Sequence, residues 1–287
     1  MSKRLDVLKT YKIYINGQFV RSESGHYLTL TNKSGEQLAN ICRSTRKDFR
    51  QAMVAARGAQ GGWSGKTAYN RGQILYRMAE ILEGRRAQFI HELSLEGASA
   101  KKAEAEVDAA IDRLVYFAGW CDKYQQIFSS VNPVQSAHFN FSTPEPTGVV
   151  SIIAEEKSSL IGLVSMIAPV IAGGNTCVVL AGQRNAMSAC SFTEVIHSSD
   201  VPSGVINVLT GLKSELISHM SSHMDINAIF YTDSDTDSKK LIQENASLNI
   251  KRVVFEETDD WMDERHENPY IILDFQEIKT TWHPVSV

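Results

Sequence analysis

The cysteines are the residues of this sequence best suited to covalent chemistry. Cys42, Cys121, Cys177 and Cys190 are widely spaced and form no CxxC pair, so neither a zinc site nor a disulfide framework is indicated. Cys121 and Cys190 fall on the apolar stripes of predicted helices, where a thiol acts as a small core residue. We therefore expect reduced thiols with structural roles.

Two further patterns resemble ligand sites but lack neighbouring residues that such sites require. His219 and His223 have the i, i+4 spacing of helical metal ligands, yet lack the Glu beside the first His that a metalloprotease needs. A histidine pair near a helix end is the favoured interpretation. Gly65-Lys66-Thr67 resembles the end of a phosphate loop, but Gln60 stands where the first Gly must be and no predicted strand precedes it.

An acidic cluster, Asp233–Asp237, lies at the start of a predicted helix. Carboxylates at a helix N-terminus interact favourably with the helix dipole. A helix N-cap is the simplest interpretation, and a cation-binding role is the weaker alternative.

A strand–helix–strand unit is the clearest element that could position such groups. Val149–Ala154 is an apolar, β-branched run, as expected for a strand buried on both faces of a parallel sheet. Leu160 to Ala172 has apolar residues at helical spacing, and Gly173-Gly174 ends that helix before a second strand at Cys177–Leu180.

The alternation of strands and helices continues downstream. With the two strands above, it makes five strands and predicts an α/β fold with a doubly wound, Rossmann-like parallel sheet. The further predicted strands are Val205–Leu209, Ile226–Tyr231 and Arg252–Phe255, and the helices are Met187–Ile196, Leu212–Ser221 and Ser238–Ala246.

The segments before this sheet are predicted to be mainly helical. Asn16-Gly17 within Tyr11–Val20 predicts a two-residue hairpin. The other predicted elements are a strand at Leu38–Ile41, a helix from the N-cap Thr45 to Gly61-Gly62, helices at Tyr69–Leu95 and Ala103–Ile127, and a weak strand at Phe139–Ser142.

The last stretch departs from the alternation. Glu256 to Glu267 is rich in acidic residues and predicts a solvated loop, and Ile271–Val287 predicts an exposed or partner-paired strand. We expect a first domain over residues 1–256, with a bridging strand near 137–147, and an acidic loop and strand over 257–287.

Composition narrows the class of protein. The net charge of −4 over 287 residues argues against nucleic acid or an anionic membrane as the main partner. The longest apolar stretch is too short to span a membrane, and the amino terminus shows no secretory signal. The cytoplasm is the expected location.

Several segments together resemble the aldehyde dehydrogenase superfamily: YINGQFV, GVVSIIA, IAPVIAGGNTCVV, VPSGVINVLTG, SHMDINAIFYTDS and NIKRVVFEE. Within that superfamily the chain resembles a degenerate, truncated member, like the C-terminal non-catalytic module of the family-sixteen enzymes. The resemblance implies the cofactor-domain fold of that superfamily.

The chain departs from the family at the positions that do chemistry. Lys157 stands where the family has the Asn that holds the oxyanion, and Leu180 and Gln183 replace the Lys and Glu that hold the adenosine ribose. Asp233–Asp237 replaces a Gly-Ser-Thr-Glu-x-Gly segment that faces the pyrophosphate. The resemblance leaves vestigial cofactor positions at Ile153, Ala154, Gln183 and Ser234.

The family's catalytic cysteine also has no counterpart. It lies beyond the family Glu that corresponds to Glu256, in a separate catalytic domain, whereas the last cysteine here is Cys190. We therefore expect the catalytic domain to be absent and Glu256 to be a strand-end carboxylate, with a general-base role the weaker alternative. Phe275 to Trp282 (FQEIKTTW) matches the strand that closes the family's chains and pairs with a neighbouring subunit.

The sequence thus predicts a catalytically inactive, aldehyde dehydrogenase-like protein that acts as a structural or regulatory partner. It would assemble with itself or with a full-length aldehyde dehydrogenase through Phe275–Val287, and no bound cofactor or metal is expected. The alternative is an NAD(P)-dependent oxidoreductase acting on aldehydes, whose catalytic Cys domain a partner supplies.

Overall fold

The computed structural model describes residues 8–32, 34–156, 160–258 and 260–285. Within these residues the central sheet has seven strands in the order β12-β11-β8-β9-β10-β2-β3. The five predicted strands are all present and mutually parallel. They are β8 (Val149–Ile153), β9 (Thr176–Leu180), β10 (Ile206–Leu209), β11 (Ala228–Tyr231) and β12 (Arg252–Phe255). The first of them, β8, lies between β11 and β9. The strand order therefore reverses within the sheet, and the doubly wound prediction is confirmed.

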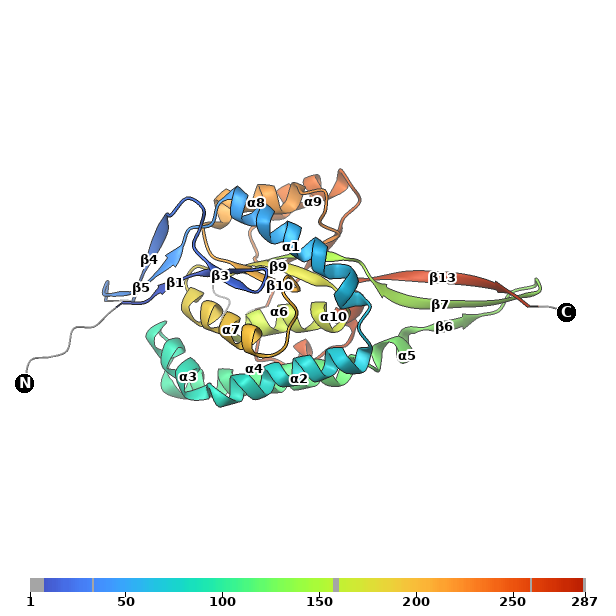
Figure 1. The fold of residues 1–287 in the computed structure, drawn as a ribbon, viewed down its shortest axis with the longest axis horizontal. Helices are drawn as coiled ribbons and strands as arrows, with labels where there is room; N and C mark the ends of the chain where they lie inside the picture. Colours follow the sequence, from blue (N-terminus) through green and yellow to red (C-terminus); the bar gives the residue numbers. More distant parts are fainter. Residues whose placement is uncertain (1–7, 33, 157–159, 259, 286–287) are drawn as a thin grey trace, which may run out of the picture.

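Helices cover both faces of the sheet (Figure 1). On one face lie α1 (Arg46–Ser64), α8 (Lys213–Ser222) and α9 (Thr236–Ser247). On the other lie α2 (Ala68–Gly84), α4 (Ala100–Trp120), α6 (Leu160–Ala172) and α7 (Ala186–Ser198), with the shorter helices α3 (Arg86–Leu95), α5 (Tyr124–Phe128) and α10 (Tyr270–Leu273).

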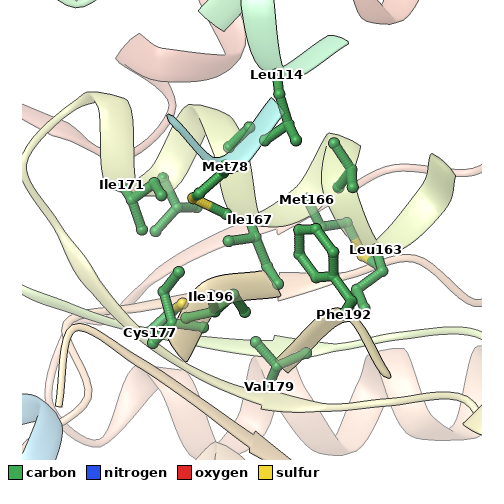
Figure 2. Close-up of a cluster of buried hydrophobic side chains, with 14 of the residues drawn as sticks. Met78, Leu114, Leu163, Met166, Ile167, Ile171, Cys177, Val179, Phe192 and Ile196 are labelled. Atoms are coloured by element: carbon green, nitrogen blue, oxygen red, sulfur yellow. The ribbon is translucent and has the colours of Figure 1, made fainter. Parts of the chain in front are cut away.

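The main core lies between the sheet and the α2–α4 layer. Every residue of α6 is buried, as expected for a helix that is apolar all round. Figure 2 shows Ile167 of α6 between Met78 and Leu114 of the outer helices and Val179 of the sheet. None of the helices within the described residues is both long and apolar enough to cross a bilayer.

The predicted amino-terminal hairpin forms and extends the central sheet. Its strands are β2 (Ile13–Ile15) and β3 (Gln18–Val20). Asn16 and Gly17 have φ values of 52° and 74°, the left-handed backbone that a two-residue hairpin turn requires. β2 pairs antiparallel with β10. A small separate sheet contains β1 (Thr10–Tyr11), β5 (Gln37–Cys42) and β4 (Tyr27–Thr31).

A three-stranded sheet extends from the body and is called the arm here (Figure 1). It consists of β6 (Ser130–Asn132), β7 (His138–Pro146) and β13 (Gln276–Pro284), with β7 in the middle. β13 runs antiparallel to β7 from Gln276↔Pro146 to Pro284↔His138. The predicted strand near 137–147 is therefore β7. The predicted strand from Ile271 begins only at Gln276, because α10 precedes it.

Three helix predictions were wrong in their limits. The single helix expected over 69–95 is two helices that meet at Arg85, whose guanidinium binds Gln88 and Glu194. The helix expected over 103–127 is α4 followed by the short α5. α1 begins after its N-cap Thr45 as predicted but continues through Gly61-Gly62 to Ser64.

Candidate functional site

The candidate site is the edge of the central sheet where the five parallel strands end. In a doubly wound sheet, ligands bind outside the carboxyl ends of the strands, at the point where the strand order reverses. Here that point lies between β8 and β11. A hydrogen bond crosses it, because the Glu155 backbone N–H donates to Thr232 Oγ1 at 3.1 Å.

The residues that follow β8 and β9 lie tightly against each other. A Cβ at Gly182 would lie 2.4 Å from the Glu155 carbonyl oxygen, so only glycine fits there. The Gln183 backbone N–H donates to Glu156 Oε2 at 2.9 Å. Ile153 and Ala154, two of the predicted vestigial positions, are buried.

The structure describes the two residues at the predicted ribose positions, but not the residue at the predicted oxyanion position. Leu180 is buried and apolar, so its side chain offers no hydrogen bond to a ribose. Gln183 lines a cavity of about 850 Å³ together with Glu156 and Arg184. Lys157 lies outside the described residues.

The acidic cluster after β11 caps α9. Asp235 is the N-cap residue and accepts the Asp237 backbone N–H at 3.3 Å. The hydrogen bond from Ser238 holds the pKa of Asp235 below its ordinary value. Asp233 forms an ion pair with Lys213, and Ser234 is exposed. The N-cap interpretation is correct.

Such a helix N-terminus fits a pyrophosphate poorly. The family's cofactor requires an N-terminus that presents free N–H groups to an anion. In this chain carboxylates accept at that position and carry negative charge themselves. A dinucleotide held in the family's manner would be repelled there.

Glu256 and the residues that follow it form a covered corner of the site. Burial raises the pKa of Glu256 above its ordinary value. Its carboxylate lies 3.8 Å from Nδ1 of the buried His266. The rings of His266 and Trp261 are 4.7 Å apart, and Trp261 Nε1 donates to Glu155 Oε1 at 3.1 Å. The segment after β12 thus packs onto the loop after β8.

The acidic stretch is therefore only partly the solvated loop that composition predicted. A guanidinium from α4 holds it in place. Arg113 is 2% exposed, donates to Ser165 Oγ at 2.8 Å, and reaches the backbone carbonyls of Trp261 and Asp263 at 3.5 and 3.4 Å. Its Nε lies 3.7 Å from Glu267. Burial lowers the pKa of Arg113.

Trp261 and Arg113 were not predicted from the sequence. For Trp261 the only local signal was its position as an aromatic residue inside an acidic run, and a tryptophan in such a run is a candidate for burial. Arg113 had no signal, because the residues it binds lie far from it in the sequence.

All four cysteines are buried and unbridged. Burial raises the pKa of Cys121 to about 12, and also raises the pKa values of Cys177 and Cys190. A buried thiol with a raised pKa is a poor nucleophile. The prediction that Cys121 and Cys190 are core residues is confirmed.

The two weaker motifs also have structural explanations. Gly65 caps α1, and Thr67 caps α2 by accepting the Asn70 backbone N–H at 3.2 Å, so this stretch is a helix–helix connection. His223 ends α8 with its ring 5.6 Å from that of Phe49. Within the described residues, no group of three His, Cys, Asp or Glu side chains is arranged to hold a metal ion.

Comparison with known proteins places these observations in a family. The aldehyde dehydrogenase family profile matches residues 19–258. The chain is 31% identical to the cytosolic 10-formyltetrahydrofolate dehydrogenase of Xenopus tropicalis over 86% of its length and 28% of that protein. It is 30% identical to the putative aldehyde dehydrogenase DhaS of Bacillus subtilis over 89% of its length and 52% of that protein.

Solved structures of aldehyde dehydrogenases have the same fold as this chain. The NAD+ complex of an aldehyde dehydrogenase from Bacillus cereus superposes with a TM-score of 0.82 at 26% identity, over 86% of this chain and 51% of that one. The chain thus spans about half the length, or less, of these relatives. The long family match and the shared fold agree with the resemblance in the sequence, and the chain belongs to the aldehyde dehydrogenase family.

Proposed function

We propose that this chain is a non-catalytic member of the aldehyde dehydrogenase family that acts as a structural or regulatory subunit in an oligomer. The observation that carries the proposal is the burial of all four thiols inside the body. An acyl-enzyme requires an accessible thiolate next to the substrate. Trp261 and His266 occupy the corner beside Glu256 instead.

The arm supports the part of the proposal that concerns a partner. Val131, Phe139, Ile278 and Trp282 are each between 46% and 67% exposed. β13 lies at an edge of the arm within the described residues, so its outer backbone groups are available to a further strand. An exposed strand edge that carries apolar side chains is a template for pairing with another chain. A second copy or a full-length aldehyde dehydrogenase would provide that cover.

The test of inactivity is an assay for aldehyde oxidation. The purified chain is incubated with NAD or NADP and a series of aldehydes, and the absorbance of the reduced cofactor is followed, with a full-length aldehyde dehydrogenase as positive control. We expect no turnover above the protein-free background. Turnover clearly above that background would overturn the proposal.

A second candidate is an NAD(P)-dependent oxidoreductase completed by a partner's catalytic domain. The close superposition on a structure that contains NAD+ favours it. The capped N-terminus of α9 and the apolar Leu180 oppose it, and we expect weak dinucleotide binding. Calorimetric titration with NAD separates the two candidates, because a micromolar dissociation constant would favour the oxidoreductase.

A further inference from the structure

Hydrogen bonds at the two ends of β13 show which of its backbone groups face away from the arm. The Thr147 N–H donates to the Phe275 carbonyl at 3.2 Å, and the Val285 N–H donates to the Ala137 carbonyl at 3.1 Å. Both pairs continue the register of β7 and β13. Hydrogen-bonded and non-hydrogen-bonded pairs alternate along an antiparallel ladder. The odd-numbered residues of β13 therefore bond to β7, and the even-numbered residues direct their N–H and C=O groups outward.

The two edges of the arm differ in their capacity to accept a further strand. On the side of β7 that faces away from β13, β6 covers only residues 140–142. Pro144 and Pro146 follow on that side, and proline has no N–H to donate. β13 pairs with β7 in one register over its whole length. Its lysine, Lys279, is of a type that often protects sheet edges, but here it forms an ion pair with Glu145 at 3.1 Å.

The apolar residues of β13 match each other when two copies of the strand run antiparallel. If Thr280 lies opposite Thr280 of the second copy, Ile278 lies opposite Trp282 and Trp282 lies opposite Ile278. Both side chains are exposed in the single chain, and in this register each would cover the other. Apolar pairs directly opposite each other on neighbouring strands stabilise a sheet.

The polar residues match in the same register. Glu277 would lie opposite His283 of the second copy, where the carboxylate can accept a hydrogen bond from the imidazole. Glu277 already pairs with Arg252 at 3.1 Å, but its side chain remains 63% exposed and has room for a second donor. Lys279 would lie opposite the uncharged Thr281.

Other antiparallel registers match less well. Centring the pair on Lys279 would place two lysines opposite each other, and like charges in that arrangement destabilise a sheet. Centring it on Thr281 would place Ile278 opposite Pro284, which has no N–H to donate. Centring it on Ile278 would leave Trp282 beyond the end of the other strand. Only a centre at Thr280 pairs the whole of β13.

We propose that two copies of this chain pair through β13, antiparallel and about a two-fold axis at Thr280. Ile278, Thr280 and Trp282 would each exchange two hydrogen bonds with the opposite residue. The arm projects from one side of the body (Figure 1), so the two arms would form one continuous sheet with a body at each end. This inference rests on the assembly role proposed above and identifies the partner as a second copy.

Replacing Thr280 by Pro tests the edge. The Thr280 N–H faces outward, so proline there spares the ladder with β7 but blocks a second copy. Light scattering should give a dimer for the wild type and a monomer for Thr280→Pro, with similar melting temperatures. Thr280→Val is the matched control and should remain a dimer, because it also loses the hydrogen bond to Ser142 but keeps the N–H. A dimeric Thr280→Pro would overturn the proposal.

Disulfide formation between two different variants tests the register. Glu277→Cys and His283→Cys chains are mixed, allowed to exchange and mildly oxidised; the four native thiols are buried. Opposite residues of a non-hydrogen-bonded pair have Cα atoms about 4.5 Å apart, a distance that a disulfide can bridge. We expect a cross-linked dimer in the mixture and none in either variant alone. A cross-link in a single variant, or none in the mixture, would overturn the register.

Failure of this inference can be told apart from failure of the proposed function. A monomeric wild-type chain would overturn the pairing of two copies and leave a full-length aldehyde dehydrogenase as the partner. Aldehyde turnover by the purified chain would overturn the non-catalytic role, whereas the cross-linking result would still decide how β13 pairs.

Discussion

Glu96 shows how a single carboxyl can make the stability of this molecule depend on pH. Its Oε1 accepts the backbone N–H groups of Met187 and Ser188 at 2.8 and 3.2 Å, at the start of α7. The N-cap residue of that helix, Asn185, makes no side-chain cap hydrogen bond. Glu96, which follows the last residue of α3, therefore caps α7. Burial raises its pKa to about 7.

Replacing Glu96 by Gln should reduce the pH dependence of stability. A carboxyl whose folded pKa exceeds its unfolded value stabilises the protein fully below the unfolded pKa, and that contribution is lost as the pH rises through the folded pKa. Between pH 4.5 and 7 the wild type should lose about 2 kcal/mol relative to Glu96→Gln.

Urea unfolding at pH 5, 6, 7 and 8 measures this difference. Glu83→Gln, on the exposed side of α2, serves as the control and should follow the wild type at each pH. A constant difference between Glu96→Gln and the wild type across this range would show that the carboxyl does not titrate there.

At the scale of elements, Arg113 fixes the segment between β12 and α10. Replacing it by Met should destabilise the chain by about 3 kcal/mol, because Glu267 and two backbone carbonyls would lose their buried partner. The segment itself should open first, since Arg113 links it to α4 and α6.

Limited trypsin digestion reports on that local opening. Cleavage after Arg265 should become faster in Arg113→Met than in the wild type. Arg86→Met removes an arginine whose ion pairs with Glu104 and Asp108 are more exposed, and should change cleavage at Arg265 little. Equal cleavage rates in the two variants would mean that Arg113 does not hold the segment.

Elements with local causes could be predicted from the sequence. The Asn16-Gly17 turn, the N-cap at Thr45 and the five parallel strands each depend on neighbouring residues. The break at Arg85 could not be predicted, because the apolar pattern continues across it and the partner Glu194 lies 109 residues away. The burial of Trp261 depends on α4 in the same way. Long-range partners decide such positions, and local propensity cannot reveal them.

At the scale of the whole molecule, the boundary between body and arm decides how assembly can be tested. Phe275 is completely buried, with its ring 5.1 Å from that of Phe230. Its carbonyl accepts from Asn175 Nδ2 at 2.9 Å, and Gln276 Nε2 donates to the Gly173 carbonyl at 3.0 Å. Phe275 therefore belongs to the body, although the sequence grouped it with the strand, and Gln276 anchors the first residue of β13 to the body.

Two truncations should therefore behave differently. Deleting residues 278–287 should abolish assembly and leave the melting temperature of the body nearly unchanged, because β13 is exposed along most of its length beyond that point. Deleting 275–287 should also destabilise the body, by about 3 kcal/mol for the lost aromatic side chain.

Light scattering and thermal unfolding of both truncated proteins measure the two effects. If the shorter deletion keeps the oligomeric mass of the wild type, the arm is not the assembly element. If both deletions have the same melting temperature, Phe275 does not contribute to the body as its burial indicates.

The pairing of β7 with β13 also has a consequence during synthesis. Ser142 and Thr280, which hydrogen bond across these strands, are 138 residues apart in the sequence. At ribosomal rates of about 5–20 residues per second, β7 leaves the ribosome roughly 7 to 30 seconds before its partner strand. During that interval the edge of β7 that β13 covers is open. We therefore expect β13 of a neighbouring nascent chain to compete with pairing within the chain, and this competition should disappear once the chain's own β13 has been made.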